Sequence, residues 1–153
     1  MFISRLRYLF VAIWALVGLM TSVGALVAGQ AVSVDADKVA IQGYDTVAYF
    51  TAGKPVKGSP EFEAVWQGAR WRFANAEHRD MFSAKPESYA PRFGGFCVMG
   101  MTIGLSAKPD PEAWTIVDGK LYLGSYKQDI DDLNKDLAGN IQKAEAAWKV
   151  RGN

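Results

Sequence analysis

The chain has 153 residues, nearly balanced charge, and a single cysteine and a single histidine. At about 100–150 residues per domain, this length allows one compact domain. Seventeen lysines and arginines against 16 acidic residues give a formal net charge of +1, so we expect no nucleic-acid partner. One cysteine excludes an internal disulfide framework, and with one histidine it excludes a zinc site made of these two residue types alone.

Residues 1–31 have the pattern of an export leader. Arg5 and Arg7 precede an uncharged run over residues 8–28, and small residues follow as far as Ala31. This order predicts a signal peptide, and the small residues favour its cleavage. The same run has the 21 residues that an uncleaved N-terminal membrane anchor needs, so it is also a candidate tether to the membrane. Both alternatives predict a periplasmic or other extracytoplasmic location.

The next predicted elements are a short helix and a hairpin. Asp45 is a suitable cap for a helix over residues 46–51, which Gly53 would close. A turn at Gln67-Gly68 would pair Ala64 with Trp71 and Phe62 with Phe73. This register gives the hairpin an apolar face and leaves Glu63 opposite Arg72 on the other face. The apolar face holds Phe62, Ala64, Trp66, Trp71 and Phe73.

Two helical segments are predicted after this hairpin. Asn75 is a good N-cap for a helix that runs to Ala84, where Lys85-Pro86 would stop it. Pro86 can begin a second short helix that runs through Tyr89.

A second hairpin is predicted at residues 114–123, around the turn residues Asp118-Gly119. We expect it to join the hairpin at about 62–73 in one small antiparallel sheet. Two apolar stripes near the C-terminus predict two further helices with Gly139 between them. The expected fold class is therefore α+β, with one domain over residues 38–149.

Several motifs in this order resemble the YHS domain, in its exported bacterial branch. They are the segment Trp71–Tyr89, the runs at 43–50 and 89–97, and the segment 110–123. The resemblance implies a small α+β module related to TRASH-type metal-binding domains and found beside copper-handling proteins. No enzymatic activity is generally assigned to this branch, so we expect that the protein is not an enzyme.

The chain departs from the family at the metal-binding cysteines, because Ala74 and His78 stand at the two thiol positions. A different site is conceivable from Cys97, Met99 and Met101, with His78 as a fourth ligand. Sulfur donors with one imidazole suit copper better than magnesium or calcium. Copper is therefore the candidate cofactor, and a copper-handling or membrane protein the candidate partner, while the oligomeric state stays open.

Other interpretations of these residues remain open. Cys97 and the methionines in such an apolar stretch are more often core fillers, which would leave a structural or small-ligand-binding module without a metal. The abundant aromatic residues could line an apolar pocket. Cys97 with His78 as base would form a thiol hydrolase, with Glu77 or Asp80 orienting the imidazole, but no local signature supports it.

Overall fold

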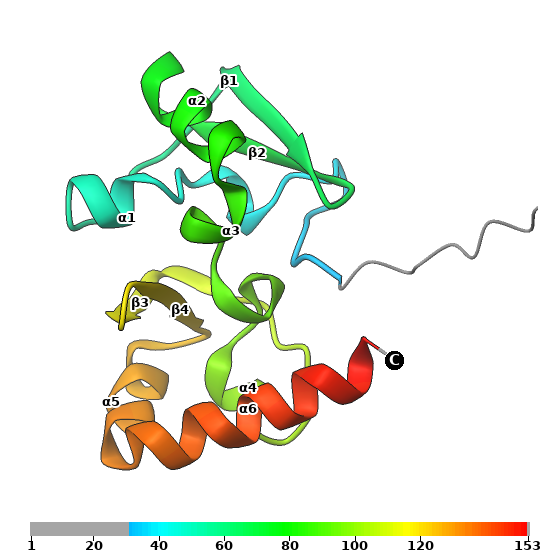
Figure 1. Ribbon diagram of the computed structural model, residues 1–153, viewed down its shortest axis with the longest axis vertical. Helices are drawn as coiled ribbons and strands as arrows, with labels where there is room; N and C mark the ends of the chain where they lie inside the picture. Colours follow the sequence, from blue (N-terminus) through cyan, green and yellow to red (C-terminus); the bar gives the residue numbers. More distant parts are fainter. Residues whose placement is uncertain (1–30, 153) are drawn as a thin grey trace, which may run out of the picture.

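The computed structural model describes residues 31–152 and has an α+β fold (Figure 1). The predicted leader lies outside the described residues, apart from Ala31. One half of the molecule contains η1 (Ile41–Gly43), α1 (Ala48–Thr51), β1 (Ser59–Trp66), β2 (Ala69–Phe73), α2 (Ala76–Ala84) and α3 (Pro86–Tyr89). The other half contains η2 (Arg92–Gly95), α4 (Val98–Met101), β3 (Asp110–Val117), β4 (Lys120–Gly124), α5 (Lys127–Lys135) and α6 (Leu137–Arg151). Within residues 31–152, no helix is long and apolar enough to cross a membrane.

Both predicted hairpins are confirmed, including their registers next to the turns. In the first, Ala64 pairs with Trp71 and Glu63 with Arg72. In the second, the pairs are Trp114–Leu123, Thr115–Tyr122, Ile116–Leu121 and Val117–Lys120. The expected Phe62–Phe73 pair is wrong, because an irregularity in β1 places Ser59 opposite Phe73.

The two hairpins do not join in one sheet, as the sequence had suggested, but form separate two-stranded sheets. On each hairpin, another segment pairs with the outer edge of the second strand. Arg70 in β2 exchanges backbone hydrogen bonds with Lys38 and Ala40. In the second hairpin, Leu123 in β4 forms a bridge with Cys97. The β2 and β4 edges are therefore paired with these segments and not with each other.

The predicted helix after the first hairpin is also confirmed. α2 begins after Asn75, whose side chain accepts a hydrogen bond from the backbone N–H of His78. The break between the two C-terminal helices is at Asp136 rather than at Gly139, which lies inside α6. Asp136 decides this position because its carboxylate accepts a hydrogen bond from the Gly139 N–H and caps the helix.

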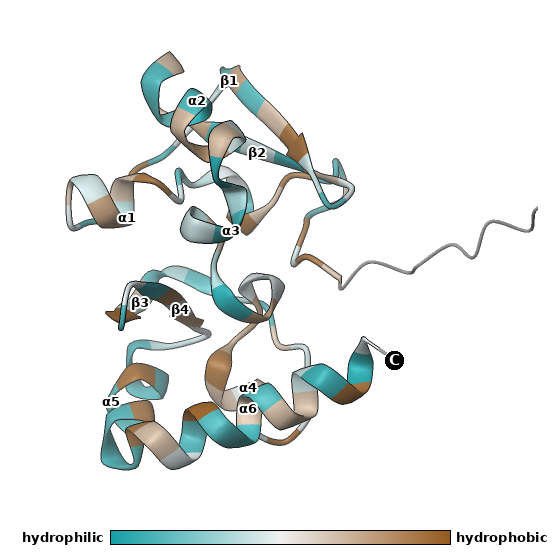
Figure 2. Ribbon diagram, viewed as in Figure 1, coloured by the Kyte–Doolittle hydropathy of each residue, from teal (hydrophilic) through white to brown (hydrophobic). Residues whose placement is uncertain are grey.

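The core consists of two clusters that meet at the second hairpin. Leu121 and Leu123 in β4 belong to the first cluster, together with Trp71, Phe73 and other residues of the first half. Tyr122, between them in sequence, belongs to the second cluster. In that cluster it packs with Phe93, Val98, Met101, Leu133 and Ala144. Alternate side chains of one strand therefore link the two halves, and β4 is among the more hydrophobic segments in Figure 2.

Candidate functional site

The cysteine predicted as a metal ligand is buried at the start of α4. Cys97 has only 2% of its surface exposed. Its Sγ lies 3.4 Å from a carboxylate oxygen of Asp129, to which the thiol donates, and it accepts a hydrogen bond of 3.4 Å from the Gly100 N–H. The sulfur is thus engaged in capping α4 and in joining it to α5.

The other predicted ligands are not gathered around this sulfur. Met101 is fully buried in the second core cluster, and Met99 packs against that cluster. His78 lies on α2, in the half of the molecule opposite α4 (Figure 1). Within residues 31–152, no group of three or more histidine, cysteine, aspartate and glutamate side chains is placed to hold a metal ion.

His78 instead belongs to an array with Asp45 and Thr51. Its Nδ1 lies 2.6 Å from a carboxylate oxygen of Asp45, and its Nε2 lies 3.2 Å from the hydroxyl of Thr51. Asp45 is fully buried, whereas Thr51 is exposed at the end of α1. The array connects α1 to α2 through side chains alone.

Asp45 has a larger role than the helix cap that the sequence predicts. One carboxylate oxygen accepts hydrogen bonds from the N–H groups of Val47 and Ala48 at the start of α1. The other accepts from the N–H of Ala74 and pairs with His78. Four contacts satisfy the buried carboxylate, which explains how it can occupy an apolar environment.

A hydroxyl, an imidazole and a buried carboxylate in sequence have the connectivity of a hydrolase triad. The carboxylate in contact with His78 is Asp45, rather than the Glu77 or Asp80 considered from sequence. However, the Thr51 hydroxyl also lies 3.2 Å from the carbonyl oxygen of Val47, a hydrogen bond typical of threonine inside a helix. Two surface clefts, one between Trp66 and Phe93 and one beside Glu63, do not include Thr51 or His78. The array therefore has the form of a structural clamp between α1 and α2.

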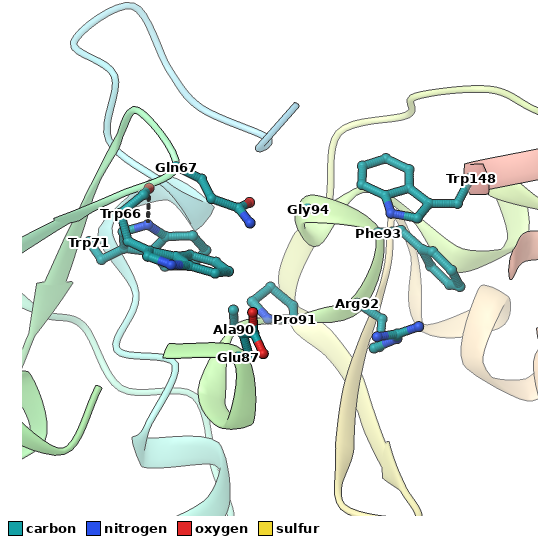
Figure 3. Close-up of a pocket in the computed structure, with 10 residues that line it drawn as sticks. All are labelled: Trp66, Gln67, Trp71, Glu87, Ala90, Pro91, Arg92, Phe93, Gly94 and Trp148. Atoms are coloured by element: carbon teal, nitrogen blue, oxygen red, sulfur yellow. Dashed lines mark hydrogen bonds between the residues drawn. The ribbon is translucent and has the colours of Figure 1, made fainter. Parts of the chain in front are cut away.

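A cleft lies between the two halves and is lined by aromatic residues from both. It has a volume of about 210 Å³. Figure 3 shows Trp66 and Trp71 on one side and Phe93 and Trp148 on the other. Trp71 and Phe93 are buried, whereas Trp66 and Trp148 are partly exposed, so the aromatic walls continue from the core to the surface.

Polar groups complete the lining of this cleft. The Gln67 side chain points from the turn of the first hairpin toward Gly94, and Glu87 lies near the base formed by Ala90 and Pro91 (Figure 3). Arg92 also lines the cleft, with its guanidinium 3.4 Å from Glu145. The arrangement of aromatic walls with a few polar groups is typical of small-molecule sites.

The local conformation of residues 93–95 positions the second wall. Phe93, Gly94 and Gly95 all have positive φ values, of 58°, 61° and 82°. A side chain at Gly94 would collide with the Ala31 carbonyl and would approach Trp148 to 3.2 Å. Close backbone packing at this Gly-Gly pair is what the sequence suggests, whereas its place in a cleft has no local sequence signal.

Comparison of the chain with models of known protein families, with curated proteins and with solved structures gives no match.

Proposed function

We propose that this protein is an exported, non-catalytic module, similar to the YHS domain, that binds a small aromatic ligand in the cleft between its halves. The observation that supports this function is the pair of facing aromatic walls, Trp66 with Trp71 and Phe93 with Trp148. Flat ligands gain from such walls because aromatic rings attract one another in stacked or edge-to-face arrangements, beyond the effect of the area buried.

The size of the cleft limits the ligand. A volume of about 210 Å³ lies below the range of about 300–1,000 Å³ that is common for drug-sized ligands. A single or fused ring system with one or two polar substituents suits this space. The Gln67 amide can donate and accept hydrogen bonds, and Glu87 provides a negative charge, whereas the Arg92 guanidinium is paired with Glu145.

This function is better supported than soft-metal binding at Cys97. A thiolate ligand would have to leave the contacts with Asp129 and Gly100, and the residue is almost fully buried. The methionines nearest in sequence fill the second core cluster. These contacts favour the interpretation of Cys97, Met99 and Met101 as core residues.

A titration with indole, as a probe of the proposed ligand class, tests the function by nuclear magnetic resonance. We expect indole to shift the amide signal of Gly94 and the side-chain N–H signals of Trp66 and Trp148. Trp148→Ala should weaken indole binding about two- to tenfold, since an aromatic pair is worth about 0.5–1.5 kcal/mol. Gln67→Ala, at an exposed turn, should weaken the binding of indole derivatives that carry a polar group, without affecting the fold.

Tyr126→Ala is the matched control, because Tyr126 is an aromatic residue that is 73% exposed and does not line the cleft. It should leave indole binding unchanged. If the Gly94 and tryptophan signals do not move, or if Tyr126→Ala and Trp148→Ala have equal effects, the cleft is not the ligand site.

A further inference from the structure

The described chain begins beside the end of α6. The N–H of Ser33 donates a hydrogen bond of 2.8 Å to the carbonyl oxygen of Gly94. Ala31 and Trp148 both lie next to Gly94, where they would contact a side chain at that position. The leader therefore joins the folded domain at a fixed point, on the side that carries Trp148.

This junction is close to the apolar run of residues 8–28. The hydrogen-bonded Ser33 lies only five positions after Ala28. Fully extended, five residues span at most about 17 Å. A leader held in a bilayer would therefore keep the C-terminal end of α6, which carries Trp148, near the membrane surface.

Exposed apolar residues gather on the segments that meet at the end of α6. Ile103 is 73% exposed, Leu105 is 58% exposed and Val150 is 76% exposed. A hydrogen bond from Arg151 to Ser106 holds the loop after α4 against the last turn of α6. The Arg151 guanidinium also lies 5.9 Å from the ring of Trp148, which connects this surface to the leader junction. We call Ile103, Leu105, Val150, Lys149 and Arg151 the leader-side patch.

The charge of the leader-side patch is positive. Lys149 and Arg151 flank Val150, and no acidic residue occurs in the sequence segments 97–109 and 146–153. Figure 2 shows hydrophilic and hydrophobic colours side by side in this last turn of α6. Apolar side chains next to basic ones are typical of surfaces that lie on anionic lipids.

We propose that, in the full-length chain with its leader uncleaved, the leader-side patch docks on an anionic lipid bilayer, with residues 8–28 as the anchor. The short connection brings the patch to the surface, its apolar side chains enter the headgroup boundary, and its basic residues contact lipid phosphates. This inference does not depend on a ligand in the cleft.

Labels at single positions in the full-length chain test this orientation. In a Cys97→Ser background, we would attach an environment-sensitive fluorophore to Ile103→Cys or Val150→Cys and reconstitute each protein into vesicles. The vesicles contain equal parts of brominated phosphatidylcholine and phosphatidylglycerol. We expect both labels to shift to shorter emission wavelengths and to be quenched by the brominated lipid.

Two exposed positions outside the patch are matched controls. Val65→Cys lies in the other half and Tyr126→Cys in the same half, and the native residues are 77% and 73% exposed. Labels at these positions should keep the emission that they have in water. The proposal is wrong if labels at residues 103 and 150 stay as accessible to water as those at 65 and 126.

The charge of the lipid can be tested with Lys149→Gln, which removes one exposed charge. In the mixed vesicles, this change should lower the ratio of docked to undocked protein about fivefold. Lys54→Gln, an exposed lysine in the other half, should have no effect. Equal docking of all proteins on pure phosphatidylcholine would overturn the requirement for an anionic surface.

Discussion

The two hairpins have the same kind of two-residue turn. Relative to that turn, however, they direct opposite faces toward the first core cluster. Each has a two-residue turn with positive φ values, Gln67-Gly68 in one and Asp118-Gly119 in the other. In the first hairpin, the residue next to the turn, Trp66, packs against the first core cluster. In the second, the residue packed against the first cluster is one position farther from the turn, at Ile116, whereas Val117 next to the turn packs against the second cluster. The turn thus determines which residues pair, whereas the order of apolar residues determines which face is buried.

The hairpins also differ in how their second faces are used. The outward face of the first contains Glu63, Arg70 and the 77% exposed Val65. The corresponding face of the second contains Tyr122, which is 2% exposed and lies 5.9 Å from the ring of Phe93. The second hairpin is therefore covered on both faces, and its two-sided burial joins the core clusters.

The largest loss of stability should come from removing the Tyr122 side chain, which lies on the buried second face of the second hairpin. Tyr122→Ala should lower the free energy of unfolding by about 3–5 kcal/mol, because it leaves a cavity in the second cluster. Val65→Ala, on the outward face of the first hairpin, should change it by less than about 0.5 kcal/mol. Urea unfolding of both variants measures the contrast. Similar values for the two would show that the second hairpin is not covered on both faces.

A smaller effect is expected at the clamp between α1 and α2 in the first half. Asp45→Asn keeps the size of the side chain but removes an acceptor for the Ala74 N–H or for His78. A buried group left without its partner costs about 1–3 kcal/mol, which thermal or urea unfolding can measure.

Asp35→Asn is a suitable control for Asp45→Asn, because the Asp35 carboxylate also accepts backbone hydrogen bonds but lies at the surface. It should change stability by less than about 0.5 kcal/mol. Equal losses for the two aspartate variants would contradict the importance of burial at Asp45.

The smallest effect should be a dependence of stability on pH, which arises from the ion pair between Glu63 and Arg70 on the outward face of the first hairpin. The hydrogen bond and charge of Arg70, 2.7 Å from Glu63, lower the pKa of this carboxyl group below its ordinary value of 4.5. The pair therefore contributes stability above pH 4.5, and this contribution is lost as the pH falls through the lowered pKa. Exposure of Arg70 keeps the contribution small.

Glu63→Gln should accordingly be slightly less stable than the native protein at neutral pH, and the difference should be smaller at about pH 3, because Glu63 gains a proton as the pH falls through its lowered pKa. Urea midpoints at the two pH values measure this, and Glu61→Gln on the same strand provides the control. A stability difference for Glu63→Gln that persists unchanged in acid would contradict an ionic origin.

Local chemistry explains which parts of the fold could be predicted. The turn residues, the Asn75 cap and the alternation around Trp71 act over a few residues, and the hairpin register and the start of α2 follow from them. The contact between Asp45 and His78 spans 33 positions and has no local signal. The sequence shows only that Asp45 lies within the apolar run 43–50, where a buried carboxylate needs a hydrogen-bonding or charged partner. It does not show which residue that partner is.

The candidate site was less predictable than the fold. Sequence spacing placed Cys97, Met99 and Met101 within five residues, yet α4 directs Cys97 to Asp129 and buries Met101 in the second core cluster. Trp66 lies in the first hairpin and Trp148 lies in α6, 82 positions later, but both face the same cleft. No periodicity relates such residues, so the cleft becomes visible only when the halves are packed.

By itself, the amino-acid sequence determined the α+β class, the two hairpins with their turns and the helices that follow them, because these depend on neighbouring residues. The tertiary structure decided that the hairpins form separate sheets, that Cys97 is engaged with Asp129, and that aromatic side chains from both halves form a cleft. These features depend on which strand edges and which faces meet when apolar surface is buried. Burial of apolar surface has no preferred direction, so no local sequence pattern predicts these contacts.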